Sequence, residues 1–210
     1  MTSKYQHALA LGSNGAHAQD ACEIFERDDI LVVALADGGG GMRRGGAASR
    51  RLIALVESAV KDRAFPLEGL SAWVDLFKTA DAGLAEQRAG ETTGIVVVLG
   101  PRKLIGVSTG DSEAWVVTST RTDNLTVGQH TRQRLGSNRA TPTAFERPAP
   151  TDVLVVASDG LFKFAAIDVI ADVVRAQAIG PAAKGLVELV RLRSGKVAED
   201  VAIALVRPAA

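Results

Sequence analysis

The sequence predicts an α+β domain in which antiparallel β-sheets are covered on their outer faces by helices. Short apolar segments bounded by Gly, Pro and Asp indicate strands, and four longer segments with apolar residues three or four positions apart indicate helices. The helices come in two adjacent pairs and do not alternate with strands, which disfavours a doubly wound parallel sheet. With 210 residues, 47% of them hydrophobic, the chain can bury a full core, and we interpret residues 1–210 as one domain.

The first part of the chain predicts strands followed by two helices. Strands are expected at residues 8–11, 21–26 and 30–36, with Asp28 and Asp29 in the hairpin turn between the last two. The run from Leu31 to Leu35 is apolar throughout, as in a strand that is buried on both faces. The helices are expected at residues 47–60 and 70–88, where the apolar residues follow a helical period.

The second part repeats this order. Residues 119–150 are polar and contain three prolines, so they are expected to be mostly irregular. The remaining strands are expected at residues 94–99, 104–108, 114–118, 153–157 and 201–206. Two further helices are expected at residues 167–178 and 183–192, separated by Gly180 and Pro181.

Composition excludes several classes of protein. The 24 basic and 24 acidic residues give a formal net charge of zero, which argues against a general nucleic-acid binder. The single cysteine, Cys22, excludes a disulfide framework and a cysteine-based zinc site. No apolar run approaches the length of a membrane span and the start lacks the pattern of a signal peptide. We therefore expect a soluble cytoplasmic protein that does not bind membranes.

Acidic residues lie at the ends of the predicted strands, often beside glycine. A strand end is a rigid platform, and glycine allows a ligand to approach the backbone closely. Carboxylates that converge there could bind Mg²⁺ or Mn²⁺, and two such ions can activate a water for phosphoryl transfer. Any one of these Asp-Gly pairs could be only a turn, but together they favour a metal site. The residues are Asp20, Asp37, Asp111, Asp159, Glu199 and Asp200.

Two other motifs give weaker predictions. Residues 106–110 match the G-x-S-x-G nucleophile elbow, but the elbow needs a following helix, and a strand is expected here. The glycine run at residues 38–46 lacks the last glycine of G-x-G-x-x-G and also lacks G-K-[ST], which disfavours a nucleotide-binding loop. The pair Arg43-Arg44 beside this run could hold a phosphate group, and His17 lies three residues before Asp20.

Six motifs in order resemble those of the metal-dependent serine/threonine phosphatases of the PP2C (PPM) family, in a small bacterial form. One of them, S-D-G-L, is present unchanged, and the others resemble E/Q-D-A, A-D-G-x-G-G, T-T, G-D-S-R-A and the closing D-N/D-x-T/A. In this chain they lie at residues 19–21, 36–41, 92–94, 110–114, 158–161 and 199–202.

The resemblance implies a four-layer αββα sandwich and a site with two Mn²⁺ or Mg²⁺ ions, with a third held more weakly. Asp37 would bridge the two metals and the Gly38 carbonyl would bind one of them. Asp159 and the closing acid would complete the second metal site, and Asp111 would bind the third metal. Asp20 would order metal-bound waters. The catalytic residues implied are Asp37, Asp159 and Asp20.

The chain departs from the family pattern at two positions. The family usually has a phosphate-gripping arginine where this chain has Gly15, so phosphate binding is weaker or falls to His17, Arg43 or Arg44. The position of the closing metal aspartate is occupied by Glu199, so either Glu199 or the adjacent Asp200 would be the ligand.

The function implied is hydrolysis of phosphoserine or phosphothreonine in a protein substrate, by a monomer acting in bacterial signalling. The resemblance points in particular to the smaller regulatory phosphatases of partner-switching pathways. The alternatives are a catalytically weak phosphoprotein-binding module, favoured by the two departures, and a purely structural interaction domain.

Overall fold

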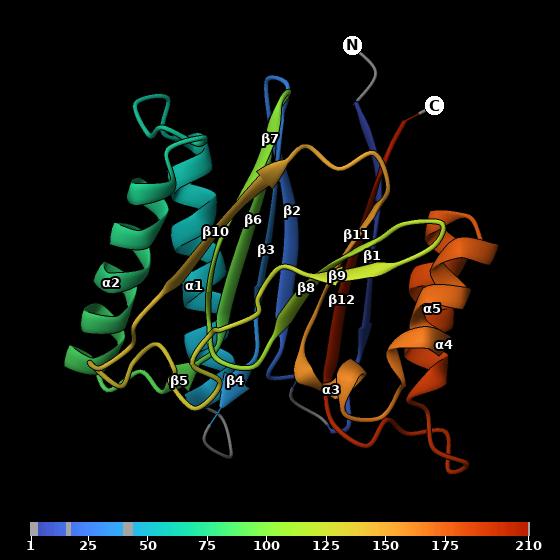
Figure 1. The fold of residues 1–210 in the computed structure, drawn as a ribbon. Helices are drawn as coiled ribbons and strands as arrows, with labels where there is room; N and C mark the ends of the chain where they lie inside the picture. The colour runs from blue at the N-terminus through green and yellow to red at the C-terminus, as the bar shows by residue number, and fades with distance from the viewer. Residues whose placement is uncertain (1–3, 16–17, 40–43, 210) are drawn as a thin grey trace.

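Two five-stranded antiparallel sheets pack face to face, with helices on both outer faces (Figure 1). This is a computed structural model, and it describes residues 4–15, 18–39 and 44–209. The predicted four-layer αββα arrangement is confirmed, since helices α1 and α2 cover one sheet and α4 and α5 cover the other.

The strands are antiparallel to every neighbour within their sheets. The first sheet has the order β1 (Tyr5–Gly12), β12 (Val201–Pro208), β11 (Val153–Ala157), β8 (Glu113–Val117) and β9 (Thr122–Asn124). The second has the order β10 (Thr143–Pro148), β7 (Lys103–Thr109), β6 (Gly94–Leu99), β3 (Ile30–Ala36) and β2 (Ala21–Arg27). A separate two-stranded sheet pairs β4 (Gly38–Gly39) with β5 (Glu91–Thr92).

Five helices complete the chain in its described part. They are α1 (Arg44–Lys61), α2 (Leu70–Glu86), α3 (Asp159–Phe162), α4 (Ile167–Ala176) and α5 (Ile179–Leu189). None of them is long and apolar enough to cross a membrane.

The continuous apolar runs arise because the central strands are buried on both faces. Val32 and Ala34 of β3 contact the core under α1 and α2, whereas Val33 and Leu35 contact the core between the two sheets. Successive side chains of a strand point to opposite faces, so both sets must be apolar. This arrangement fixes β3, which leads into Asp37, as a strand buried between the helices and the other sheet.

Two helices begin earlier than predicted. Helix α1 begins at Arg44, three residues early, because Gly45 and Gly46 pack tightly against the backbones of Gly38 and Ala18. Helix α5 begins at Ile179 and not at Ala183, because Pro181 lies in the first turn, where a helix needs no backbone N–H donor.

The segment 119–150 is mostly irregular, as predicted, but it also contains β9 and β10, which were not predicted. Between them lies a loop held by side-chain contacts, with no regular pattern of apolar residues. The predicted absence of a nucleophile elbow is confirmed, since β7 is followed by β8, and Ser108 is fully buried within β7.

Candidate active site

Three carboxylates from both sheets meet at one end of the sandwich. Asp37 follows β3, Asp111 follows β7, and Asp159 follows β11. One carboxylate oxygen from each lies within 4.8 Å of the others. Among the described residues, these three form the one cluster of acidic, histidine or cysteine side chains that is close enough to hold a metal ion. Convergence of strand ends, which the sequence suggested, therefore brings together three acids that are 48 to 122 residues apart in the chain.

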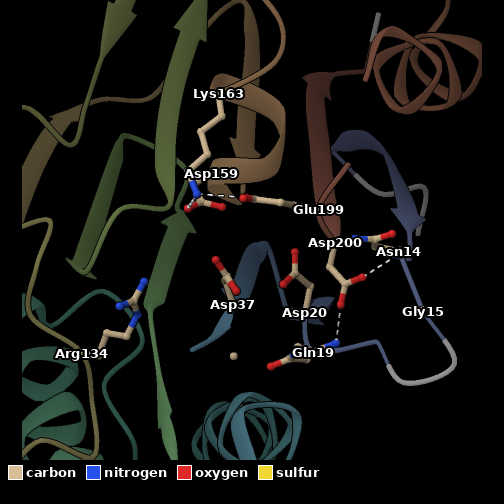
Figure 2. A pocket seen from close by; sticks show the side chains of 11 residues that line it. Asn14, Gly15, Gln19, Asp20, Asp37, Arg134, Asp159, Lys163, Glu199 and Asp200 are labelled. Atoms are coloured by element: carbon tan, nitrogen blue, oxygen red, sulfur yellow. Dashed lines mark hydrogen bonds and ion pairs between the residues drawn. The ribbon is translucent and has the colours of Figure 1, made fainter. Parts of the chain in front are cut away.

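Two of these acids, Asp37 and Asp159, line a cleft with a volume of about 410 Å³ (Figure 2). Its lining is mostly charged or polar: Asn14, Gly15, Gln19, Asp20, Asp37, Gly38, Arg134, Asp159, Lys163, Glu199 and Asp200. Figure 2 shows Asp37 and Asp20 side by side, with Asp159 and Lys163 above them and Arg134 to the left.

Asp20 and Asp37 have few neighbouring groups that would offset the negative charge of their carboxylates. Asp20 is only 8% exposed, and neither of its carboxylate oxygens has a well-formed hydrogen bond in the described part of the chain. Burial first, and then the charge of Asp37, raises the pKa of Asp20 to about 9. Burial first, and then the charge of Asp159, raises the pKa of Asp37 to about 6.

Burial and the charge of Asp159 also raise the pKa of Asp111, whose Oδ1 is buried without a hydrogen-bond partner among the described residues. Oxygen-only donors, close together, buried and short of positive charge, fit a hard divalent cation such as Mg²⁺ or Mn²⁺.

Backbone contacts hold Asp37 rigidly. Its carbonyl oxygen accepts hydrogen bonds from the Thr93 N–H (2.8 Å) and the Thr92 hydroxyl (2.9 Å), and its own N–H donates to the Thr93 hydroxyl (3.0 Å). Gly38 follows in β4, where a Cβ atom would overlap the backbone of Gly45 at the start of α1. The glycine is therefore required by the close approach of two backbones beside the site.

The two closing acids have different surroundings. The carboxylate of Asp200 accepts the N–H of Asn14 on Oδ1 and that of Gln19 on Oδ2, both at 2.7 Å. Its two oxygens thus anchor the segment before β2. Glu199 instead turns toward Asp159, and its Oε2 lies 2.9 Å from the Lys163 ammonium (Figure 2).

Two cations at the cleft were missed by the sequence analysis. Arg134 extends over Gly39, where a Cβ atom would lie 2.6 Å from its Nε, and its Nη2 lies 3.5 Å from Asp111 Oδ2. Lys163 lies 2.7 Å from Asp159 Oδ2. Lys163 could have been found from its i,i+4 spacing to Asp159, but Arg134 lies in a loop that carries no periodic signal.

The phosphate-binding residues suggested by the sequence lie elsewhere. His17 and Arg43 fall outside the described residues. Arg44 is the exposed first residue of α1 and is not part of the cleft lining.

Comparison with known proteins agrees with this geometry. Residues 11–190 match the family model of protein phosphatase 2C. The chain belongs to the protein phosphatase 2C family. Members of this family are serine/threonine protein phosphatases, so the predicted family and enzyme class are confirmed.

Solved structures with the same fold include bacterial serine/threonine phosphatases. The Mycobacterium tuberculosis phosphatase PstP/Ppp superposes with a TM-score of 0.84 at 21% identity, covering 98% of this chain and 99% of that one. The S. agalactiae serine/threonine phosphatase superposes with a TM-score of 0.84 at 23% identity, covering 98% of this chain and 100% of that one. The catalytic domain of PstP in complex with two manganese ions gives 0.80 at 22% identity, with 97% coverage of both chains. Comparison with curated protein sequences finds no match.

Proposed function

We propose that this chain is a divalent-metal-dependent phosphatase that hydrolyses phosphoserine and phosphothreonine in protein substrates. The observation that carries the proposal is the convergence of Asp37, Asp111 and Asp159 beside the buried, poorly compensated Asp20. Membership of the protein phosphatase 2C family supports the same reaction.

Asp37, Asp111 and Asp159 are the side chains that would hold Mn²⁺ or Mg²⁺, together with the backbone carbonyl of Gly38. Bound divalent ions supply a water of lowered pKa and offset the negative charge of the phosphoryl group. Of the two closing acids, Asp200 is the weaker candidate for a metal ligand, because its oxygens accept two backbone amides.

The chain's own residues contribute charge and position. Arg134 and Lys163 both line the cleft beside the acids, where they would attract the phosphoryl oxygens of the substrate. The water oxygen forms a bond to phosphorus, the bond from phosphorus to the serine or threonine oxygen breaks, and that oxygen leaves with a proton. The Asp20 carboxylate, beside Asp37 in the cleft, would order the waters bound to the metal.

Phosphate release from a phosphothreonine peptide tests the proposal. The wild-type chain should release phosphate with Mn²⁺ present and stop when EDTA is added. Asp37→Ala should abolish turnover, whereas Asp75→Ala, on the exposed face of α2, should match wild type. Full activity in Asp37→Ala, or activity undiminished by EDTA, would contradict the proposal.

A second function is favoured by one observation. Lys163 neutralises Asp159 and Glu199, so the chain could bind a phosphoprotein while turning it over weakly. Calorimetry with Mn²⁺ combined with turnover of p-nitrophenyl phosphate separates the two functions. Metal binding without turnover would support the binding module.

We also propose the setting of the reaction. The bacterial structures with the same fold suggest a bacterial signalling phosphatase, and the zero net charge disfavours nucleic acid as a partner. We propose that the chain acts in the cytoplasm as a monomer. Size-exclusion chromatography with light scattering tests the oligomeric state, and a mass twice that of the 21.9 kDa chain would contradict it.

A further inference from the structure

Lys163 stands between two acids of the candidate site. It follows the single turn of α3, and its backbone N–H donates to the Asp159 carbonyl oxygen at 2.9 Å. This turn carries the side chain back over its own N-terminus, where the ammonium lies 2.7 Å from Asp159 Oδ2 and 2.9 Å from Glu199 Oε2 (Figure 2). The Lys163 side chain is 49% exposed, so the ammonium closes the outer edge of the cleft.

The charges of the candidate site divide into two halves. In the Lys163 half, the ammonium compensates Asp159 and Glu199. In the Asp37 half, Arg134 lies 3.5 Å from Asp111, whereas Asp37 and Asp20 have no cation this close in the described part of the chain. The shortage of positive charge is therefore greatest around Asp37 and Asp20.

Donor geometry follows the same division. Asp37, Asp111 and Asp159 form a set of three oxygens within 4.8 Å, and Glu199 is not part of it. Asp159 contributes to both halves, because it has two carboxylate oxygens and Lys163 occupies Oδ2. A second divalent ion between Asp159 and Glu199 would have to displace the ammonium, or accept its repulsion at short range.

We propose that Lys163 is a resident cation that replaces a second tightly bound metal, so that this chain binds one divalent ion, at Asp37, Asp111 and Asp159. The inference rests on the proposed function, since it concerns the same metal site. It also identifies Lys163, in the cleft lining, as a positive charge available to the substrate phosphate.

Titration calorimetry with Mn²⁺ at neutral pH measures the number of ions bound. Wild type and Lys163→Arg, which keeps the charge, should each bind one ion. Lys163→Met, of similar length and without charge, should bind two, because Asp159 and Glu199 become available. The double variant Lys163→Met/Glu199→Gln should return to one.

The matched control is Lys103→Met, which removes an exposed lysine from an ion pair with Glu146 on β7 and β10, away from the cleft. It should bind one ion, like wild type. Thermal melts in EDTA check that each variant is folded, and the exposure of Lys163 predicts little loss of stability.

The outcomes separate the inference from the proposed function. Two tightly bound ions in wild type would overturn the role of Lys163 and leave the proposed function standing. One ion in both wild type and Lys163→Met would also overturn the role of Lys163 and leave the proposed function standing. No bound ion in wild type would overturn the proposed function and the inference with it.

Discussion

Asp81 anchors the loop that carries Arg134, and its removal should have a large effect. Asp81 lies on α2, is 5% exposed, and its carboxylate accepts backbone N–H groups of Gly136 (2.7 Å), Asn138 (2.9 Å) and Ala140 (2.9 Å). Hydrogen bonds to a charged group contribute about 1.5–3 kcal/mol each. Three at the lower end amount to about 4–5 kcal/mol, of which water recovers part because the loop is only half-buried. We expect Asp81→Ala to lower the free energy of unfolding by about 3 kcal/mol.

Urea denaturation measures this change, and hydrogen exchange locates it. The amides of Gly136, Asn138 and Ala140 should exchange faster in Asp81→Ala, and phosphatase activity should fall as Arg134 loses its position. Asp75→Ala, on the same helix in an exposed ion pair with Lys78, should change stability by less than about 0.5 kcal/mol. If the two alanine variants are equally stable, the anchoring role of Asp81 is refuted.

Three further changes test the site. Gly38→Ala should weaken Mn²⁺ binding at least tenfold, because the added Cβ overlaps the Gly45 backbone. The control Gly83→Ala, which has open space on α2, should stabilise the chain by about 0.5–1 kcal/mol. Equal Mn²⁺ affinity in Gly38→Ala and wild type would contradict this prediction. The raised pKa values of Asp20 (about 9) and Asp37 (about 6) mean that the folded state binds more protons than the unfolded state. In EDTA, the melting temperature of wild type should therefore fall as the pH rises from about 4 to about 9, and it should fall less steeply in Asp20→Asn. Identical slopes in wild type and Asp20→Asn would contradict the raised pKa of Asp20. Arg134→Met should raise KM for a phosphopeptide about tenfold, equivalent to about 1.4 kcal/mol, and an unchanged KM would remove Arg134 from the phosphate site.

Most of the fold could be predicted because the central strands are buried on both faces. Runs such as that in β3 are apolar throughout, and this signal is local. Acids lie at the ends of these and other strands, which is why six of them were candidates before their distances were known; the structure brings Asp37, Asp111 and Asp159 together as one donor group.

The rest depends on contacts between distant parts of the chain. Arg134 reaches the cleft only because Asp81, more than fifty residues earlier, holds its loop. Likewise, the carboxylate of Asp200 is engaged by the amides of Asn14 and Gln19, which come from the other end of the sequence. Neither contact leaves a periodic or compositional signal.

The metal position is tested most directly by an anomalous difference map from crystals grown with Mn²⁺. We predict a strong peak among the carboxylates of Asp37, Asp111 and Asp159. Between Asp159 and Glu199 we expect electron density for the Lys163 ammonium and no anomalous peak. A map without a peak at the three aspartates would contradict the account.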